Sequence, residues 1–312
     1  EKAPYATDAW HKLGIAYGST GRWTEALEAY DRAAELDPVD VEITVNRAIA
    51  LEQLGRVDEA QPLIEAALTA DPTNLDALFT KGLVLAKQEH YDEALRLFLY
   101  LAKQDSFRRD ALFEVAICHE ALENFNEALA IYDTLIDMDP YEPNAWFNKG
   151  VIHGKKGASR QALRCYDMAT VIKPDFVNAW YNMGNTYAML NRIEESIGAY
   201  REAHAADPSD VPVIHNLASS LEESGRFEEA ADMFTKVLDI EPTHAQALYG
   251  RGSCYDALEQ FDKAVADYET ALTLEPTYGD LWYAKADALF NLRRLPESLA
   301  AYRRALELQP ED

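Results

Sequence analysis

Proline recurs in this sequence at a fixed interval, and this spacing is the feature that most constrains the fold. Pro38 and Pro72 lie 34 residues apart, and every later interval in the series is 34 residues or twice that. The later members are Pro140, Pro174, Pro208, Pro242, Pro276 and Pro310. Ser106 occupies the single gap. Because a period of roughly 20 to 50 residues is the signature of a tandem array, the chain divides into repeats.

The division leaves residues 1–6 as an N-terminal lead-in and makes residues 7–312 a single array. Positions are counted from the start of each repeat, so that the periodic proline is position 32. The nine repeats are residues 7–40, 41–74, 75–108, 109–142, 143–176, 177–210, 211–244, 245–278 and 279–312.

Each repeat contains two amphipathic segments that predict two helices. Position 4 is mostly large and apolar, position 8 is always glycine or alanine, and position 11 is mostly tyrosine or leucine. These three positions share one face of a helix. The second segment has alanine or serine at position 20 and an aromatic residue at position 24, except for Ile64 in repeat 2. Tight turns between the two helices are predicted at Gly21, Gly55, Gly157 and Gly225. The periodic proline ends the second helix, so each repeat is predicted to be a helical hairpin.

The pattern resembles the tetratricopeptide repeat family, and repeat 1 has nearly every consensus residue in "AWHKLGIAYGSTGRWTEALEAYDRAAELDP". The resemblance implies an all-α, right-handed superhelical solenoid of nine tandem helical hairpins. Four departures place the geometry of repeats 3 to 5 in question. They are Ser106 in place of proline, Ser159 at the apolar position 17, and His119 and His153 at the aromatic position 11.

The charge composition limits the classes of partner that the protein is expected to bind. With 29 Lys and Arg against 54 Asp and Glu, the net charge of −25 disfavours nucleic acid and anionic membranes and favours a neutral or basic protein or peptide. No apolar run reaches transmembrane length and no signal peptide is visible. A cytoplasmic protein is expected because the three cysteines form no CxxC pair and read as reduced core residues. The chain begins with Glu1 rather than methionine, so we expect a truncated N-terminus and a fragment of a longer protein.

The sequence shows no catalytic signature, and no enzyme activity, cofactor or metal is predicted. Cys118, Cys165 and Cys254 form no CxxC pair and are expected to be reduced core residues. His119 and His153 share position 11, where the usual tyrosine also has a polar tip, and no ligand spacing supports a metal site. Glycine-rich phosphate loops and hydrolase motifs are lacking from the sequence.

Positions 2, 5, 6, 9, 12 and 13 of the first helix form a separate face, which in the tetratricopeptide family lines a concave peptide-binding groove. We call it the first-helix face. Position 6 is asparagine in four repeats, as Asn46, Asn148, Asn182 and Asn216. Positions 5 and 9 are apolar pairs in repeats 2 to 5, as Val45 and Ile49, Phe79 and Leu83, Phe113 and Ile117, and Phe147 and Val151.

The same face becomes polar in the later repeats, beginning with Tyr181 and Asn185. The pairs that follow are His215 and Ser219, Tyr249 and Ser253, and Tyr283 and Asp287. Acidic residues flank the face at position 2, as Asp8, Glu42, Asp76 and Asp110, and at position 12, as Glu52, Glu120, Glu222 and Asp256. Two readings stay open. The face could bind a ligand, or positions 5 and 9 could fill the seam between hairpins while asparagine belongs to the repeat consensus.

Two known kinds of tetratricopeptide repeat bear on the possibility that the first-helix face binds a ligand. The carboxylate-clamp subfamily grips chaperone tails with two asparagines and three cations. Here Asn185 and Asn216 match the asparagines, but Tyr181, Gln246 and Gly250 stand where the cations should be, which argues against a clamp. The asparagine row of repeats 5 to 7 instead resembles the asparagine ladder of O-linked N-acetylglucosamine transferases, which holds peptide backbones.

Repeat 5 departs from the acidic background. Its six basic residues are Lys149, Lys155, Lys156, Arg160, Arg164 and Lys173, and its two acidic residues are Asp167 and Asp175. Lys155 stands at position 13, inside the first-helix face. The cluster is interpreted as a solvated patch or as an anchor for an acidic residue of the ligand.

Taken together, these patterns predict a protein-interaction scaffold that binds a peptide or helix of a partner in its groove. A first alternative is the substrate-recognition repeat domain of a larger, glycosyltransferase-like enzyme. A second is a self-assembling array, because the second helix of repeat 9 has an apolar face with no following repeat to cover it. That face consists of Leu299, Tyr302, Leu306 and Leu308.

Overall fold

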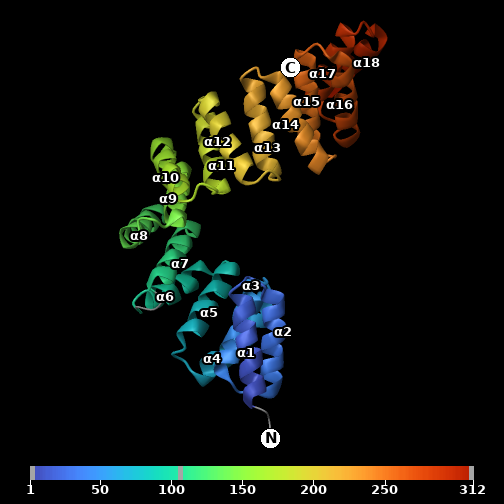
Figure 1. The fold of residues 1–312 in the computed structure, drawn as a ribbon. Coiled ribbons are helices and arrows are strands. Elements are labelled where there is room, and N and C mark those ends of the chain that lie inside the picture. Colours follow the sequence, from blue (N-terminus) through green and yellow to red (C-terminus); the bar gives the residue numbers. More distant parts are fainter. Residues whose placement is uncertain (1–3, 105–107, 309–312) are drawn as a thin grey trace. The chain divides into compact units, whose positions relative to one another are not determined.

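The computed structural model describes residues 4–104 and 108–308, and this part of the chain contains eighteen α-helices and no strand (Figure 1). The helices pair in sequence order into hairpins, one for each predicted repeat, which confirms the all-α class and the tandem hairpin architecture. The chain forms two compact units, Glu1–Ala145 and Trp146–Asp312, which we call the N-terminal body and the C-terminal body. The assignment of residues 7–312 to one domain stays a prediction.

The first helices of the hairpins run over positions 1 to 13 in most repeats. α1 begins earlier, at Pro4 within the expected lead-in. The first helices are α1 (Pro4–Gly18), α3 (Val41–Gln53), α5 (Leu75–Lys87), α7 (Arg108–Ala121), α9 (Pro143–Lys155), α11 (Val177–Met189), α13 (Val211–Glu223), α15 (Ala245–Ala257) and α17 (Gly279–Asn291).

The second helices are fourteen residues long except for α6, which has eleven. α6 ends at Leu101. Ser106, which replaces the periodic proline of repeat 3, and Pro310, the periodic proline of repeat 9, both lie outside the described residues. The second helices are α2 (Trp23–Leu36), α4 (Val57–Ala70), α6 (Tyr91–Leu101), α8 (Phe125–Met138), α10 (Ser159–Ile172), α12 (Ile193–Ala206), α14 (Phe227–Ile240), α16 (Phe261–Leu274) and α18 (Leu295–Leu308).

The turn inside every hairpin uses a left-handed residue at position 15. The four predicted turn glycines have φ between +71° and +78°. The other five repeats place Glu89, Glu123, Asn191, Glu259 and Arg293 there, with φ between +56° and +63°. The turn geometry is therefore a property of the repeat, and glycine is only the residue that adopts it at least cost.

In the hairpins that have glycine at position 8, the missing side chain makes room for the large side chain at position 24. A Cβ added to Gly184 of α11 would lie 2.5 Å from the ring of Tyr200 in α12. Gly82 shows the same relation to Phe98, at 2.6 Å. The two helices can approach closely because one of them lacks a side chain at the contact.

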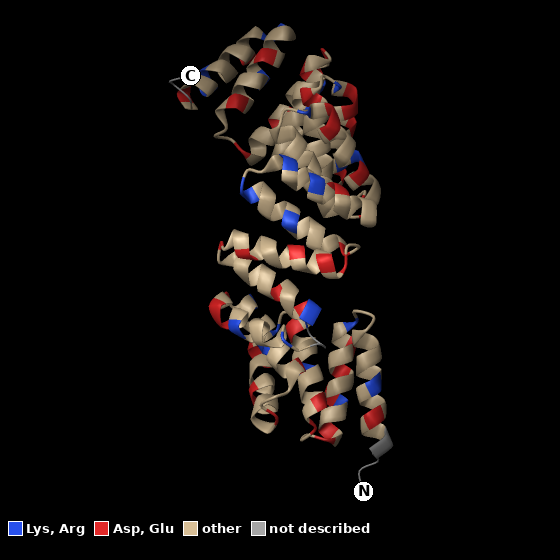
Figure 2. Ribbon diagram, turned by 90° about the vertical axis from the view of Figure 1, so that its left-hand side faces the viewer, with Lys and Arg blue, Asp and Glu red and all other residues tan. Residues whose placement is uncertain are grey.

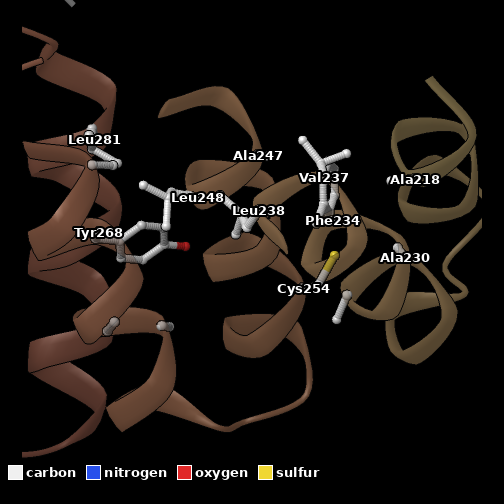
Figure 3. Packing of buried hydrophobic residues seen from close by; sticks show 14 of the residues in the cluster. Ala218, Ala230, Phe234, Val237, Leu238, Ala247, Leu248, Cys254, Tyr268 and Leu281 are labelled. Carbon is white, nitrogen blue, oxygen red and sulfur yellow. The ribbon is translucent and has the colours of Figure 1, made fainter. Parts of the chain in front are cut away.

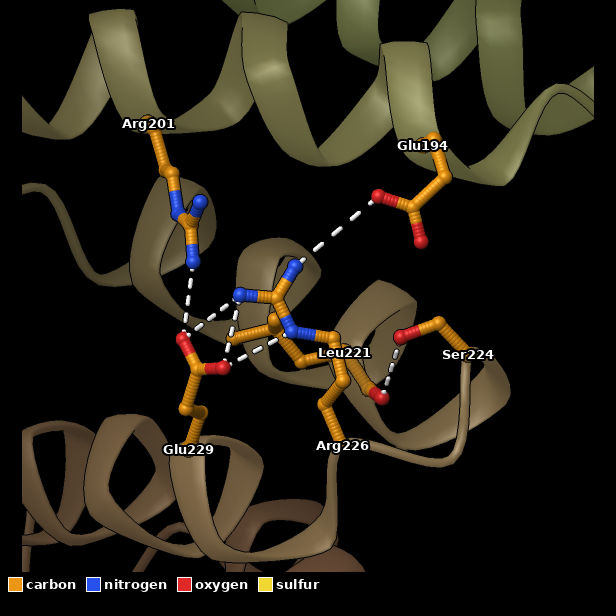
Figure 4. Close-up of polar contacts among 6 residues, drawn as sticks. All are labelled: Glu194, Arg201, Leu221, Ser224, Arg226 and Glu229. Carbon is orange, nitrogen blue, oxygen red and sulfur yellow. Dashed lines mark hydrogen bonds and ion pairs between the residues drawn. The ribbon is translucent and has the colours of Figure 1, made fainter.

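The largest apolar cluster lies in the C-terminal body and passes from one hairpin to the next (Figure 3). Phe234, Cys254 and Tyr268 are each almost fully buried in it. On the surface, Arg201 of α12 and Arg226, just before α14, both pair with Glu229 of α14 at 2.7 Å and 2.6 Å (Figure 4). Burial between neighbouring hairpins is the main stabilising term of a repeat array.

Candidate functional site

All thirteen residues predicted to bind a partner lie on first helices, and the structure leaves each of them at least partly accessible. Ile117 and Lys155 are exposed, and the other eleven are half-buried. Those eleven are Asn46, Asn148, Asn182, Asn185, Asn216, Phe79, Leu83, Phe113, Phe147, Val151 and Tyr181.

The aromatic residues at position 5 also have a structural role. The rings of Phe79 and Phe98 have centroids 5.5 Å apart, and those of Tyr181 and Tyr200 are 6.0 Å apart. Position 5 of the first helix therefore packs on position 24 of the second helix in the same hairpin. Phe113 and Phe147 make the corresponding contacts. Each ring thus fills part of the hairpin seam while staying half-buried, and Phe147 also packs on Phe176 at 5.0 Å.

In the C-terminal body, Asn185 and Asn216 belong to a hydrogen-bond network between α11, α12 and α13. The Oδ1 atom of Asn185 accepts from the Tyr200 hydroxyl at 2.6 Å and from Asn216 Nδ2 at 3.1 Å. Asn216 Nδ2 also donates to the Tyr181 hydroxyl at 3.1 Å. Because an amide group has two N–H donors, this network uses both hydrogens of Asn216, and the Asn216 side chain also hydrogen-bonds His215. The Nδ2 donors of Asn185 are left over.

Asn46 makes an equivalent link in the N-terminal body. Its Nδ2 atom lies 2.7 Å from Nε2 of His11, the residue at position 5 of the preceding repeat. An asparagine at position 6 thus bonds backward along the array wherever position 5 of the preceding repeat offers a polar atom. The side chains of Asn46 and Asn216 therefore use part of their hydrogen-bonding capacity in contacts with the preceding repeat.

Asn148 and Asn182 differ, because in the part of the chain that the structure describes neither side-chain amide has a hydrogen-bond partner. For Asn182 the reason is visible in the preceding repeat. Asn216 bonds to Tyr181 and Asn185, which occupy positions 5 and 9 of the repeat before it. In the repeat before Asn182, the same two positions hold the apolar residues Phe147 and Val151. The donor and acceptor of Asn182 are therefore both left for solvent or a ligand.

The asparagine row ends at repeat 8, where position 6 is Gly250. A Cβ at this glycine would lie 2.4 Å from the ring of Phe234, so a side chain would meet a core residue of the preceding hairpin. The row thus comprises Asn148, Asn182 and Asn216, all in the C-terminal body.

Two residues expected on the first-helix face of the N-terminal body are buried instead. Val45 at position 5 packs in a small apolar cluster with Ala67 and Ala77. Glu52 at position 12 is almost fully buried, and its carboxylate pairs with Lys87 at 2.6 Å. The burial of Val45 agrees with the second reading, in which position 5 fills the seam between hairpins, because it packs against its own hairpin and the next. The expectation that Glu52 flanks an open face was wrong, because Lys87 of the following hairpin pairs with it.

The analysis of the sequence missed Glu114, which stands at position 6 of repeat 4, where four other repeats have asparagine. Burial, followed by the negative charges of Glu52 and Asp110, raises the pKa of the Glu114 carboxyl to about 7. In the sequence, Glu114 could have been noticed as the one acidic residue at position 6, where four other repeats have asparagine.

The basic residues of repeat 5 are partly engaged by aromatic rings. Lys149 Nζ lies 5.6 Å from the Trp146 ring, and Lys173 Nζ lies 5.1 Å from the Phe176 ring. Acidic residues, by contrast, occur on helices throughout the chain (Figure 2). Lys155 is exposed on α9, as its position in the repeat predicts.

The three cysteines are free and buried, which confirms their prediction as core residues. Burial raises the pKa of the Cys118 thiol to about 11 and that of Cys254 to about 12. Among the residues that the structure describes, no group of three or more His, Cys, Asp or Glu side chains is arranged to hold a metal ion. No helix in the same ranges is long and apolar enough to cross a membrane.

Comparison with protein families identifies the repeat. Models of the tetratricopeptide repeat match residues 11–74 and 79–143 in the first half of the chain. In the second half, tetratricopeptide repeat models match residues 177–210, 213–245, 245–278 and 279–312. No curated protein matches the chain as a whole.

Solved structures show the same fold at low sequence identity. The C-terminal part of a TPR repeat-containing protein from Cytophaga hutchinsonii is 19% identical, with a TM-score of 0.63 over 75% of this chain and 96% of that one. YrrB, described as a TPR protein with an unusual peptide-binding site, is 17% identical, with a TM-score of 0.55 over 58% of this chain and 93% of its own. MamA is 20% identical, with a TM-score of 0.52 over 54% and 92%.

Proposed function

The chain belongs to the tetratricopeptide repeat family, and from this premise we propose that it is a non-catalytic interaction scaffold that binds an extended segment of a partner protein. Arrays of this kind use their long repeated surfaces for binding. YrrB, which shares the fold, is described as having a peptide-binding site. We place the binding surface on the first-helix face of the C-terminal body.

The observation that carries the proposal is the unused hydrogen-bonding capacity of the asparagine row. The internal network leaves the Nδ2 donors of Asn185 available, and Asn182 keeps both donor and acceptor. A peptide unit needs one acceptor for its N–H and one donor for its C=O. The row therefore suits a main chain of any sequence.

The spacing of the row agrees with an extended ligand. Neighbouring hairpins pack about one helix diameter apart, roughly 10 Å, while an extended peptide rises about 3.3 Å per residue. Successive asparagines would then meet the ligand at about every third residue. The half-buried rings at position 5 lie beside this path and would contact side chains, which decide which sequences bind.

The experiment is a pull-down with the purified chain, followed by peptide mapping of the captured partner and titration of the mapped peptide. Replacing Asn148 and Asn182 together by alanine removes amides that have no partner in the described structure. At about 1 kcal/mol per contact, the double variant should bind about thirtyfold more weakly.

Gln161→Ala on the exposed surface of α10 is the matched control and should bind as the wild type does. Circular dichroism and thermal unfolding establish that both variants are folded. Unchanged affinity of a folded double variant would mean that the asparagine row is scaffold only and that the binding surface lies elsewhere.

Self-association is a second candidate function, favoured by the exposed apolar side chains of α18. Leu299 and Leu306 are 53% and 60% exposed, whereas the equivalent Val265 and Leu272 of α16 are 3% and 7% exposed. The remaining alternative, that these repeats present substrate to a catalytic domain elsewhere in a longer protein, stays a prediction.

A further inference from the structure

Two tyrosines stand on the first-helix face of the last two repeats, and a third lies between the two repeats. Tyr249 stands at position 5 of α15, Tyr283 at position 5 of α17, and Tyr278 directly before α17. The rings of Tyr249 and Tyr278 have centroids 6.0 Å apart, and Tyr278 and Tyr283 are both exposed. Elsewhere the chain covers tyrosine rings with its own cations, as Arg192 covers Tyr187 at 4.6 Å. In the described part of the chain, no cation lies over these three rings.

Three carboxylates lie on three successive first helices, with that of Glu222 close enough to Tyr249, and that of Asp256 close enough to Asp287, to interact electrostatically. They are Glu222 of α13, Asp256 of α15 and Asp287 of α17. Glu222 hydrogen-bonds Ser253, and Asp287 accepts from the Tyr302 hydroxyl. Among the described residues, none of the three carboxylates has a lysine or arginine partner.

Asp256 is the least satisfied of the three. Its Oδ1 atom is buried and has no hydrogen-bond partner in the described structure. Burial and the negative charge of Asp287 both raise the pKa of the Asp256 carboxyl, and burial also raises the pKa of Glu222. The cations on the same helices are engaged elsewhere, Arg251 with Asp267 and Lys285 with Glu269. A buried, unpaired carboxylate is costly, and a cation supplied by a ligand would remove that cost.

We propose that Tyr249, Tyr283 and the carboxylates of Glu222, Asp256 and Asp287 form a subsite for a lysine or arginine side chain of the bound segment. Aromatic faces attract a cation, and the carboxylates accept its N–H groups. This inference rests on the proposed function. The subsite lies one to two hairpins beyond Asn216. At roughly 10 Å per hairpin and about 3.3 Å per residue, the basic residue stands about three to six residues from the main chain held at Asn216.

The test is a selection of random twelve-residue peptides by the immobilised full chain. We expect the selected peptides to share a lysine or arginine. Selection by the variant Asp256→Asn/Asp287→Asn should still yield peptides but without that enrichment. Asp262→Asn on the exposed surface of α16 is the matched control and should keep the enrichment.

A titration then measures the contact directly. One selected peptide is compared with a copy in which norleucine replaces the basic residue. The wild type should lose on the order of tenfold in affinity, while the Asp256→Asn/Asp287→Asn variant should lose about twofold or less.

The outcomes separate the two proposals. Peptides selected by the wild type without basic enrichment would overturn the subsite and leave the scaffold function standing. Enrichment that survives in the Asp256→Asn/Asp287→Asn variant would also overturn the subsite. Failure of the folded wild type to select any peptide would overturn the proposed function and the subsite with it.

Discussion

At the scale of single residues, Glu114 shows how one substitution in a repeat changes the chemistry of a position. Asparagine at position 6 can hydrogen-bond without carrying charge, whereas Glu114 places a carboxylate there, half-buried on α7. The pKa of its carboxyl rises from 4.5 to about 7, mainly through burial. Between these two values the folded chain binds a proton that the unfolded chain releases, so its stability falls as the pH rises through that window.

We therefore predict that Glu114→Gln stabilises the protein above this window. At pH 8 the free energy of unfolding should rise by at most about 3 kcal/mol, and at pH 5 the gain should be much smaller. Urea unfolding followed by circular dichroism at both pH values measures the difference. Glu127→Gln on exposed α8 is the control and should show no such dependence. A gain that is equal at pH 5 and pH 8 would contradict the explanation.

At the scale of elements, the hairpin is held together by the contact of position 8 with position 24. Gly184 of α11 faces the Tyr200 ring of α12, and its missing side chain permits their approach. Gly198 of α12 lies in a helix of the same hairpin but has no atom within 4 Å of an added Cβ. The two glycines therefore separate the effect of packing from that of helix propensity.

Substituting each glycine by alanine should change stability in opposite directions. Gly184→Ala forces the Tyr200 ring to shift, and we expect a net loss of about 1–2 kcal/mol in the free energy of unfolding. Gly198→Ala meets no atom and should gain roughly 0.5–1 kcal/mol through helix propensity. Thermal and urea unfolding measure the free energy of unfolding of both variants. A loss of stability in both would contradict the role assigned to the contact between Gly184 and Tyr200.

At the scale of the whole molecule, the burial of apolar surface passes from hairpin to hairpin within the C-terminal body, and α18 of repeat 9 leaves part of its apolar surface uncovered. In α18, Leu299 and Leu306 face solvent, although their equivalents in α16 are covered by α17. Exposed apolar patches of this kind mark interaction surfaces in soluble proteins. We propose that a second copy of the chain covers this face when its concentration is high.

The variant Leu299→Glu/Leu306→Glu should abolish that association. Sedimentation velocity over a hundredfold range of concentration should show concentration-dependent oligomers for the wild type and a monomer for the variant. Val171→Glu, at an exposed apolar residue of α10, is the control and should behave as the wild type does. A wild type that remains monomeric at every concentration would contradict the proposal that the chain self-associates through α18.

Much of the fold was predictable from the sequence because each contact that defines a hairpin joins fixed positions of one repeat. Position 8 meets position 24, and position 15 makes the turn, so the pattern of Gly184 and Tyr200 recurs with the same meaning along the chain. The buried, free state of the cysteines followed from their positions as well. The candidate binding residues lie on first helices, as their positions in the repeat indicate, and their role stays a prediction.

Only the tertiary structure decided which residues of the first-helix face are available. Asn182 and Asn216 occupy the same position, yet Asn216 is engaged and Asn182 is not, because the preceding repeats place different side chains beside them. Val45 packs against Ala67 of its own hairpin and Ala77 of the next, and Glu52 pairs with Lys87 of the next hairpin, a contact that no period within one repeat reveals. The sequence by itself determined the repeated contacts inside hairpins. The hydrogen-bond partners and the charge of each exposed position depend on how neighbouring hairpins pack, and that packing is a property of the folded array.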